Sequence, residues 1–179
     1  MKAIPVSDLD TYSRLALPMI LAKFPDWEQF AVLAPRTDGA GSTVDFNLPC
    51  PSVAADHGLW VSTAGEELTV GFHTHHNHFT DYEEARLNPV QIEAGLDHIR
   101  DSLCERIGVV SWYRDSAFAA SQTIALPYLD PLPRPLAGLG LGAKADDMFA
   151  GCHRATLRSW RGRFDRDEDH GSPLEEYIP

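Results

Sequence analysis

Half of the eight histidines in this chain lie in one six-residue segment, and this segment constrains the fold more than any other. It is His73-Thr74-His75-His76-Asn77-His78. Two short runs of β-prone residues, 59–63 and 68–72, come directly before it, and the four residues between them predict a hairpin loop. Alternate side chains of a strand share a face. If the second strand simply continues, His76 and His78 turn inward or to the sheet edge, whereas His73 and His75 face the opposite surface.

The composition is that of an ordinary globular domain. The chain has 179 residues, of which 44% are hydrophobic and 23% are charged, and this length buries a normal core. We expect a single domain over residues 1–164 and an acidic tail over 165–179. No apolar run approaches the roughly 20 residues of a membrane span. The amino terminus has no signal-peptide core, so neither membrane insertion nor export is expected.

The cysteine content indicates the cellular compartment, and the net charge indicates the class of partner. The three cysteines (Cys50, Cys104 and Cys152) have no paired spacing, which favours neither a disulfide framework nor a Cys-rich zinc site and fits a reducing cytoplasm. The net charge of −11 would repel a phosphate backbone, so nucleic acid is not expected as a direct partner. The charge instead serves solubility or attracts a basic partner protein.

Periodicity along the chain predicts an α+β fold. Ser7, with Asp10 three residues on, predicts a helix from Asp8 that Pro18 kinks or ends. Strands are expected over 30–33 and 43–48, in the histidine hairpin, over 108–113 and 118–126, and in the basic stretch 154–164. We therefore expect a mainly antiparallel sheet of about five to seven strands, packed against a central helix and an N-terminal helix.

The central helix is the clearest element, and it is expected over residues 89–106. Asn88 predicts its N-cap and Pro89 its first position. One apolar stripe runs along it at helical spacing: Ile92, Leu96, Ile99 and Leu103. We expect this stripe to pack on the strand face that carries Leu68, Val70 and Phe72. The aromatic residues near the histidines are also expected in the core: Trp60, Phe72 and Phe79.

The histidine segment permits a metal-site hypothesis. His73, His75 and His78 offer neutral imidazoles that one zinc ion can use while keeping a position open for water. With Asn77 they resemble the His-x-His-x-Asp-His motif of the metallo-β-lactamase superfamily, which implies a metal-dependent hydrolase. Asn77 stands where that motif has aspartate, and an amide cannot supply the carboxylate that the superfamily uses. A zinc-dependent hydrolase is therefore the alternative hypothesis.

A binding surface is the other hypothesis for this segment. Three acidic residues follow directly (Asp81, Glu83 and Glu84), and they would offset the mutual repulsion of protonated imidazoles. Together with His76 and His78 they are the predicted partner-binding residues. Under this hypothesis the protein has no catalytic residues and no cofactor.

The order of several segments favours the binding hypothesis. The segments that carry this order begin with Trp60-Val61, followed by residues 67–72 and 76–79. Cys104-Glu105-Arg106 comes next, and residues 109–114 and 157–165 complete the order. From about Leu59 to Asp165 this order resembles the immunity proteins encoded beside bacterial polymorphic or contact-dependent-inhibition toxins. The resemblance implies a cytoplasmic, non-enzymatic protein that binds and neutralises a cognate toxin domain. Many such toxins are basic nucleases, and an acidic inhibitor gains association rate from opposite charge.

Overall fold

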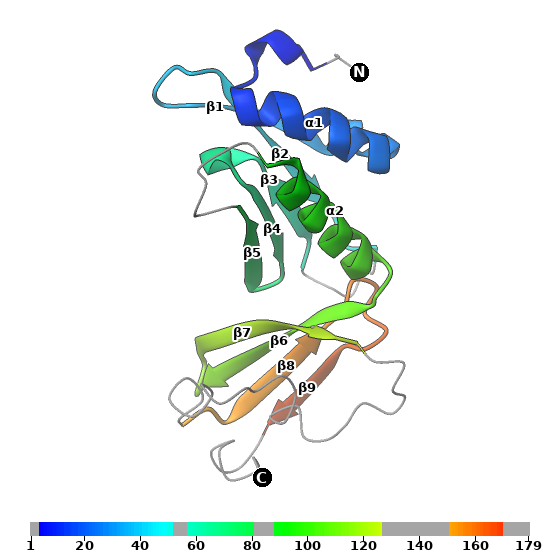
Figure 1. Cartoon of the computed structure of the whole chain (residues 1–179). Helices are drawn as coiled ribbons and strands as arrows, with labels where there is room; N and C mark the ends of the chain where they lie inside the picture. The colour runs from blue at the N-terminus through cyan, green and yellow to red at the C-terminus, as the bar shows by residue number, and fades with distance from the viewer. Residues whose placement is uncertain (1–3, 52–56, 81–87, 127–150, 170–179) are drawn as a thin grey trace. The chain divides into compact units, whose positions relative to one another are not determined.

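The computed structural model describes residues 4–51, 57–80, 88–126 and 151–169 (Figure 1). The chain forms two compact units, where the sequence predicted one domain over residues 1–164. The first unit holds residues 1–50, 57–72 and 76–100, and the second holds 51–56, 73–75 and the chain from 101 onward. Among the described residues, the first unit is built on a five-stranded sheet (sheet A) and the second on a four-stranded sheet (sheet B).

Sheet A follows the order of the chain. Its strands are β1 (Ala31–Pro35), β2 (Ser42–Leu48), β3 (Leu59–Ser62), β4 (Leu68–Phe72) and β5 (His75–Phe79). The first four pair antiparallel, with Phe46 opposite Val61 and Val61 opposite Val70. These side chains are buried, together with Val44, Leu59, Leu68 and Phe72. We call the face that they form the inner face of sheet A.

Helix α1 (Thr11–Lys23) begins at Thr11 and not at the predicted Asp8, which lies in the 3-10 helix η1 (Val6–Asp8). The reason is its cap, because Asp10 Oδ1 accepts a 2.7 Å hydrogen bond from the Ser13 amide. Pro18 was expected to kink or end the helix, yet the helix runs five residues beyond it, to Lys23. Pro18 lies on the exposed side, and the buried residues Ala16, Leu17 and Ile20 continue the packed side past it.

Helix α2 (Pro89–Leu103) has the predicted cap, because Asn88 Oδ1 accepts a 3.0 Å hydrogen bond from the Val90 amide. Its apolar stripe is buried at Ile92, Leu96 and Ile99 and partly buried at Leu103. Gly95 marks the closest approach to the sheet. A Cβ atom there would lie 2.6 Å from Leu68 Cδ2 and 3.1 Å from a ring carbon of Phe79. The helix therefore packs on the inner face of sheet A, beside Leu68 as predicted.

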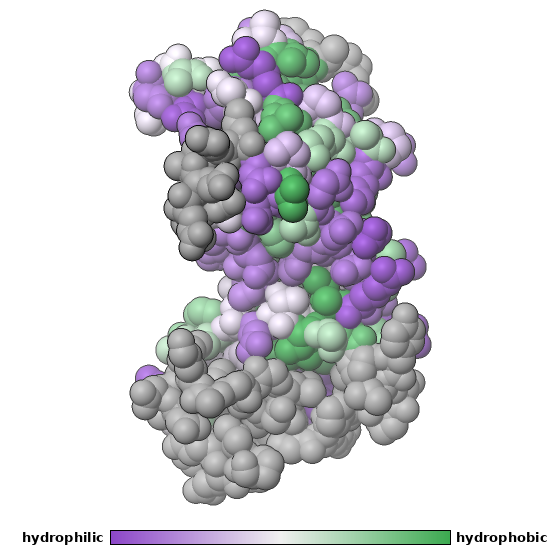
Figure 2. Space-filling model, in the orientation of Figure 1, coloured by the Kyte–Doolittle hydropathy of each residue, from purple (hydrophilic) through white to green (hydrophobic). Residues whose placement is uncertain are grey.

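Both helices lie on the inner face of sheet A (Figure 1). Lys23 Nζ, at the end of α1, lies 2.8 Å from Asp97 Oδ1 and 3.3 Å from Glu93 Oε2 on α2. These contacts raise the pKa of Lys23, chiefly through the hydrogen bond to Asp97, and lower the pKa of Asp97. The side of α2 turned away from the sheet is mostly hydrophilic (Figure 2). The predicted α+β architecture, with antiparallel strands and these two helices, is confirmed.

Two further 3-10 helices belong to the first unit. One follows α1 (η2, Pro25–Phe30), and the other joins β3 to β4 (η3, Ala64–Glu66). Trp27 of η2 is buried, with its ring centroid 5.9 Å from that of Phe46 on the inner face. The loop predicted between β3 and β4 is therefore a short helical turn, in which Gly65 has a positive φ of 75°.

Sheet B has the order β7-β6-β8-β9. Its strands are β6 (Ile107–Arg114), β7 (Ala117–Ala125), β8 (Arg154–Arg158) and β9 (Arg166–Asp169). All three neighbouring pairs are antiparallel. Residues of the strands and two residues beside them, Leu126 and Cys152, form one buried cluster. Its strand residues are Val110, Trp112, Ala120, Ile124, Ala155 and Leu157. Each unit therefore has its own hydrophobic core.

The end of sheet B differs from the sequence-based expectation. The stretch 154–164 was predicted to be one strand, but β8 ends at Arg158 and residues 160–164 form turns. Arg166–Asp169 was placed in a frayed tail and instead forms β9. The pairing of β8 with β9 brings opposite charges together, since Arg158 Nη1 lies 2.6 Å and Arg154 Nη2 3.6 Å from the Asp167 carboxylate. The hydrogen bond from Arg158 is the main cause that lowers the pKa of Asp167.

Candidate functional site

The candidate site is the side of sheet A opposite the helices, which we call the outer face. Strand register and side-chain contacts place the following residues on it: Val32, Asp45, Asn47, Trp60, Ser62, Thr69, Gly71, His76 and His78. Two of them, His76 and His78, are predicted partner-binding residues. Their strand, β5, is the last strand of sheet A among the described residues.

A two-residue turn decides which histidines reach the outer face. His73 and Thr74 form this turn between β4 and β5, and His73 adopts a positive φ of 53°. Such a turn pairs the residues on either side of it, so the alternation of β5 shifts by one residue relative to a continuous strand. His76 and His78 therefore do not turn inward. They lie at the sheet edge, the other place predicted for them, because β5 is the last strand of sheet A among the described residues. Both are exposed, whereas His75, Asn77 and Phe79 take the other orientation.

His78 is held by two residues at the start of β4. Its Nδ1 lies 2.5 Å from Glu67 Oε1 and 3.2 Å from Thr69 Oγ1. Thr69 Oγ1 in turn donates a 3.0 Å hydrogen bond to the same Glu67 oxygen. The ring of His76 meets that of His78 edge to face, with the centroids 4.9 Å apart. The two imidazoles thus stand side by side, and one of them is fixed by a carboxylate.

Trp60 lies next to this histidine pair, and its expected place in the core is wrong. It alternates with the buried residues Leu59 and Val61, so it points to the outer face, where it is 37% exposed. Its indole covers Gly71, because a Cβ atom on Gly71 would lie 2.0 Å from Trp60 Cε2 and 2.1 Å from Nε1. The ring centroid of His76 is 6.2 Å away. The alternation of 59–61 is the sequence signal that identifies this residue.

The inner side of β5 faces α2. Asn77 Nδ2 lies 3.2 Å from His98 Nε2, and the rings of Phe79 and His98 have centroids 5.4 Å apart. Phe79 is partly buried beside Gly95, and Phe72 is buried in the core as predicted. Asn77 and His78 of the predicted motif therefore lie on opposite sides of β5.

His73 and His75 belong to the second unit. There Thr74 Oγ1 lies 2.5 Å from Ser111 Oγ on β6, and His75 Nδ1 lies 2.9 Å from Ser121 Oγ on β7. Within the described parts of the chain, no group of three or more His, Cys, Asp or Glu residues is arranged to hold a metal ion. The set proposed for zinc (His73, His75 and His78) is therefore not found as a ligand group.

Three of the predicted partner-binding residues, Asp81, Glu83 and Glu84, lie outside the described residues. They follow β5, the strand that carries His76 and His78, by a few positions in the sequence.

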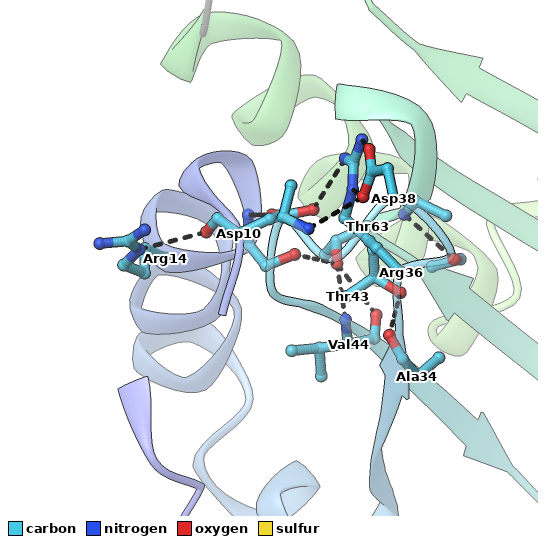
Figure 3. Close-up of polar contacts among 12 residues, drawn as sticks. Asp10, Arg14, Ala34, Arg36, Asp38, Thr43, Val44 and Thr63 are labelled. Atoms are coloured by element: carbon cyan, nitrogen blue, oxygen red, sulfur yellow. Dashed lines mark hydrogen bonds and ion pairs between the residues drawn. The ribbon is translucent and has the colours of Figure 1, made fainter. Parts of the chain in front are cut away.

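A second polar cluster lies where the start of α1 meets the turn between β1 and β2 (Figure 3). Asp10 Oδ2 lies 3.3 Å from Arg36 Nη1, and Arg36 also contacts both carboxylate oxygens of Asp38, at 3.0 and 2.6 Å. These contacts raise the pKa of Arg36 and lower that of Asp38, in each case chiefly through the Arg36–Asp38 hydrogen bond. Gly41 permits the close approach, because a Cβ atom there would lie 2.9 Å from the Asp10 amide nitrogen.

Buried hydroxyls complete this cluster. Ser13 Oγ lies 2.7 Å from Thr63 Oγ1, and Thr63 Oγ1 accepts a 2.8 Å hydrogen bond from the Val44 amide (Figure 3). Asp10, Ser13 and Thr63 are nearly or fully inaccessible to solvent. The cluster fixes α1 to sheet A, and its charges satisfy one another. We assign it a structural role.

The described residues include no helix long and apolar enough to cross a membrane. When the chain is compared with protein-family models, curated proteins and solved structures, none of them matches it significantly.

Proposed function

We propose that this protein is a non-enzymatic immunity protein that acts in the cytoplasm, where it binds a cognate bacterial toxin domain and neutralises it. The observation that carries the proposal is the outer face of sheet A. Both helices pack on the inner face, and the outer face presents Trp60, His76 and His78 to solvent. Tryptophan is among the residues that contribute most to protein interfaces. Edge strands are also common places for a partner to add.

The distribution of charge supports a basic partner. The chain has a net charge of −11, and two arginines of the basic strand β8 are engaged in contacts with Asp167. The acidity of the rest of the chain therefore remains available to attract a basic toxin domain, such as a nuclease. Blocking the substrate groove of such a toxin requires no catalysis by the inhibitor. It requires a binding surface, and the outer face can provide one.

Co-expression with the protein encoded immediately upstream tests the proposal. That protein should stop growth when expressed alone, and growth should return when this chain is present and co-purifies with it. If the upstream protein is harmless, or if the two proteins do not co-purify, the proposal fails.

Two variants test whether the outer face is the surface that binds the toxin. The double substitution His76→Ala with His78→Ala should weaken co-purification, because both side chains are exposed there. Val90→Ala is the matched control, since Val90 is 71% exposed on α2 at the helix side of the unit. The control should protect cells as well as the parent protein does.

A further inference from the structure

We infer that the outer face of sheet A, centred on Trp60, is a docking platform for an arginine-bearing basic segment of the partner protein. This rests on the proposed function and deepens it, because it names the chemistry that the partner must present. Two features carry the inference: the way the Trp60 indole is supported, and the charges that surround it.

Trp60 is built as a platform. Gly71 of β4 lies beneath it, and three indole atoms would come within 2.4 Å of a Cβ atom at that position. A side chain at position 71 would displace the indole, so the absence of one lets the ring rest on the backbone of the neighbouring strand. One side of the ring is thereby covered, and the residue remains 37% exposed. A supported, half-exposed indole offers the flat surface on which a guanidinium group stacks.

The charges around the platform have the sign that a cation needs. Asp45 Oδ1 accepts a 2.6 Å hydrogen bond from Ser62 Oγ on the outer face, and Glu67 Oε1 contacts His78 and Thr69. Neither carboxylate has a lysine or arginine partner among the residues that the structure describes. None of the nine residues that define the outer face is itself lysine or arginine.

Arginine fits this surface better than lysine does. The planar guanidinium can stack on the indole while its N–H groups donate to a neighbouring carboxylate, whereas an ammonium group is a compact, strongly hydrated charge. The histidine pair borders the platform on one side, since the His76 ring centroid lies 6.2 Å from that of Trp60. The partner segment is therefore expected to place an arginine over Trp60 and to extend along β5.

The test uses the full chain and two synthetic peptides of equal length and charge, one alternating arginine and glycine and the other alternating lysine and glycine. The Trp60 indole N–H resonance, assigned through the Trp60→Phe variant, reports binding at this site. The arginine peptide should move this resonance and bind about two- to fivefold more tightly than the lysine peptide, as expected for stacking at an exposed site. An indole resonance that neither peptide moves would overturn the proposal.

Three variants separate stacking from general attraction. Trp60→Leu keeps an apolar side chain without a ring and should abolish the preference for arginine, whereas Trp60→Phe should retain part of it. Glu67→Gln should weaken binding of both peptides more than Asp26→Asn does. The latter removes the same charge from an exposed position outside the face. An unchanged arginine preference in Trp60→Leu contradicts the proposal, as do equal effects of the two charge variants.

The toxin assay distinguishes this proposal from the proposed function. If the parent chain protects cells and Trp60→Leu protects them equally, the docking platform is wrong and the immunity function stands. If the parent chain does not protect, the immunity function fails whatever the peptides do. If sedimentation shows a dimer that Trp60→Leu converts to a monomer, a second copy of the chain occupies the face and the docking proposal is overturned.

Discussion

Each sheet carries acidic side chains on a polar face, and the two sheets differ in the groups that these carboxylates contact. In sheet B, the arginines of β8 are matched by Asp167 on β9. On the outer face of sheet A, Asp45 contacts a hydroxyl, and Glu67 contacts a hydroxyl and an imidazole. A face whose charges are paired internally gains little from a new partner, because a partner must first displace the existing ion pairs. Among the described residues, the carboxylates of the outer face of sheet A contact Ser62, Thr69 and His78 and no lysine or arginine. We therefore propose the outer face as the binding surface.

The largest loss of stability is expected when the packing of α2 beneath the outer face is disrupted. Leu96 is fully buried on α2, so Leu96→Ala should cost about 2–5 kcal/mol through lost burial and the cavity left behind. Urea unfolding followed by circular dichroism measures the loss. Val90→Ala on the same helix is the control and should change stability by less than about 0.5 kcal/mol. Equal losses in the two variants would mean that α2 does not hold sheet A through this stripe.

A smaller loss of stability is expected when the polar cluster that fixes α1 to sheet A is disrupted. Asp10→Ala removes both the helix cap and the contact with Arg36, and cap removal alone costs about 0.5–2 kcal/mol. Asp10→Asn keeps a cap oxygen and loses the charge, so it should be less destabilising. Thermal unfolding of both variants gives the order. If asparagine is as harmful as alanine, the contact with Arg36 dominates and the cap contributes little.

The smallest loss of stability is expected when the contact between Asp167 and the arginines of β8 is removed. Asp167 is half exposed, so Asp167→Asn should cost no more than about 1 kcal/mol at neutral pH. Its pKa is lowered in the folded protein, so its contribution is present above the unfolded value of about 4 and is lost as the pH falls through the folded value. Urea midpoints of variant and parent should therefore differ at pH 7 and converge as the pH falls below the folded pKa of Asp167. A difference that persists in acid would show that packing, and not charge, is lost.

The sequence predicted the elements of the first unit well because local signals coincide there. Strand β4 has the expected bounds, and Asn88 caps α2 as expected. Prediction failed where the outcome depends on which contacts form in the fold. The cap of α1 is Asp10, whose carboxylate accepts from the Ser13 amide and contacts Arg36, and Asp167 on β9 contacts two arginines of β8. Composition alone shows a charged segment but cannot show which segment of opposite charge lies beside it.

The candidate site was predicted only in part, and one turn accounts for much of the difference. His76 and His78 share one face at the sheet edge, as predicted, but the His73-Thr74 turn makes this the outer face and not the inner one. A positive φ is uncommon for any residue other than glycine, and the segment contains no glycine or proline that would mark the turn. Trp60 was missed because an aromatic residue in an apolar run suggests core, although alternation with Leu59 and Val61 places it outside.

The hydroxyl of Thr63 also determines what the Val44 amide reports. This amide donates to a side-chain oxygen just beyond the end of β3, and the same oxygen contacts Ser13 of α1. Exchange of the Val44 amide proton with solvent deuterium therefore requires the Thr63 hydroxyl to move and does not require the strands to separate. The exchange rate of this amide therefore reports movement of the Thr63 hydroxyl that joins α1 to sheet A. Local openings of this kind occur well below the free energy of complete unfolding.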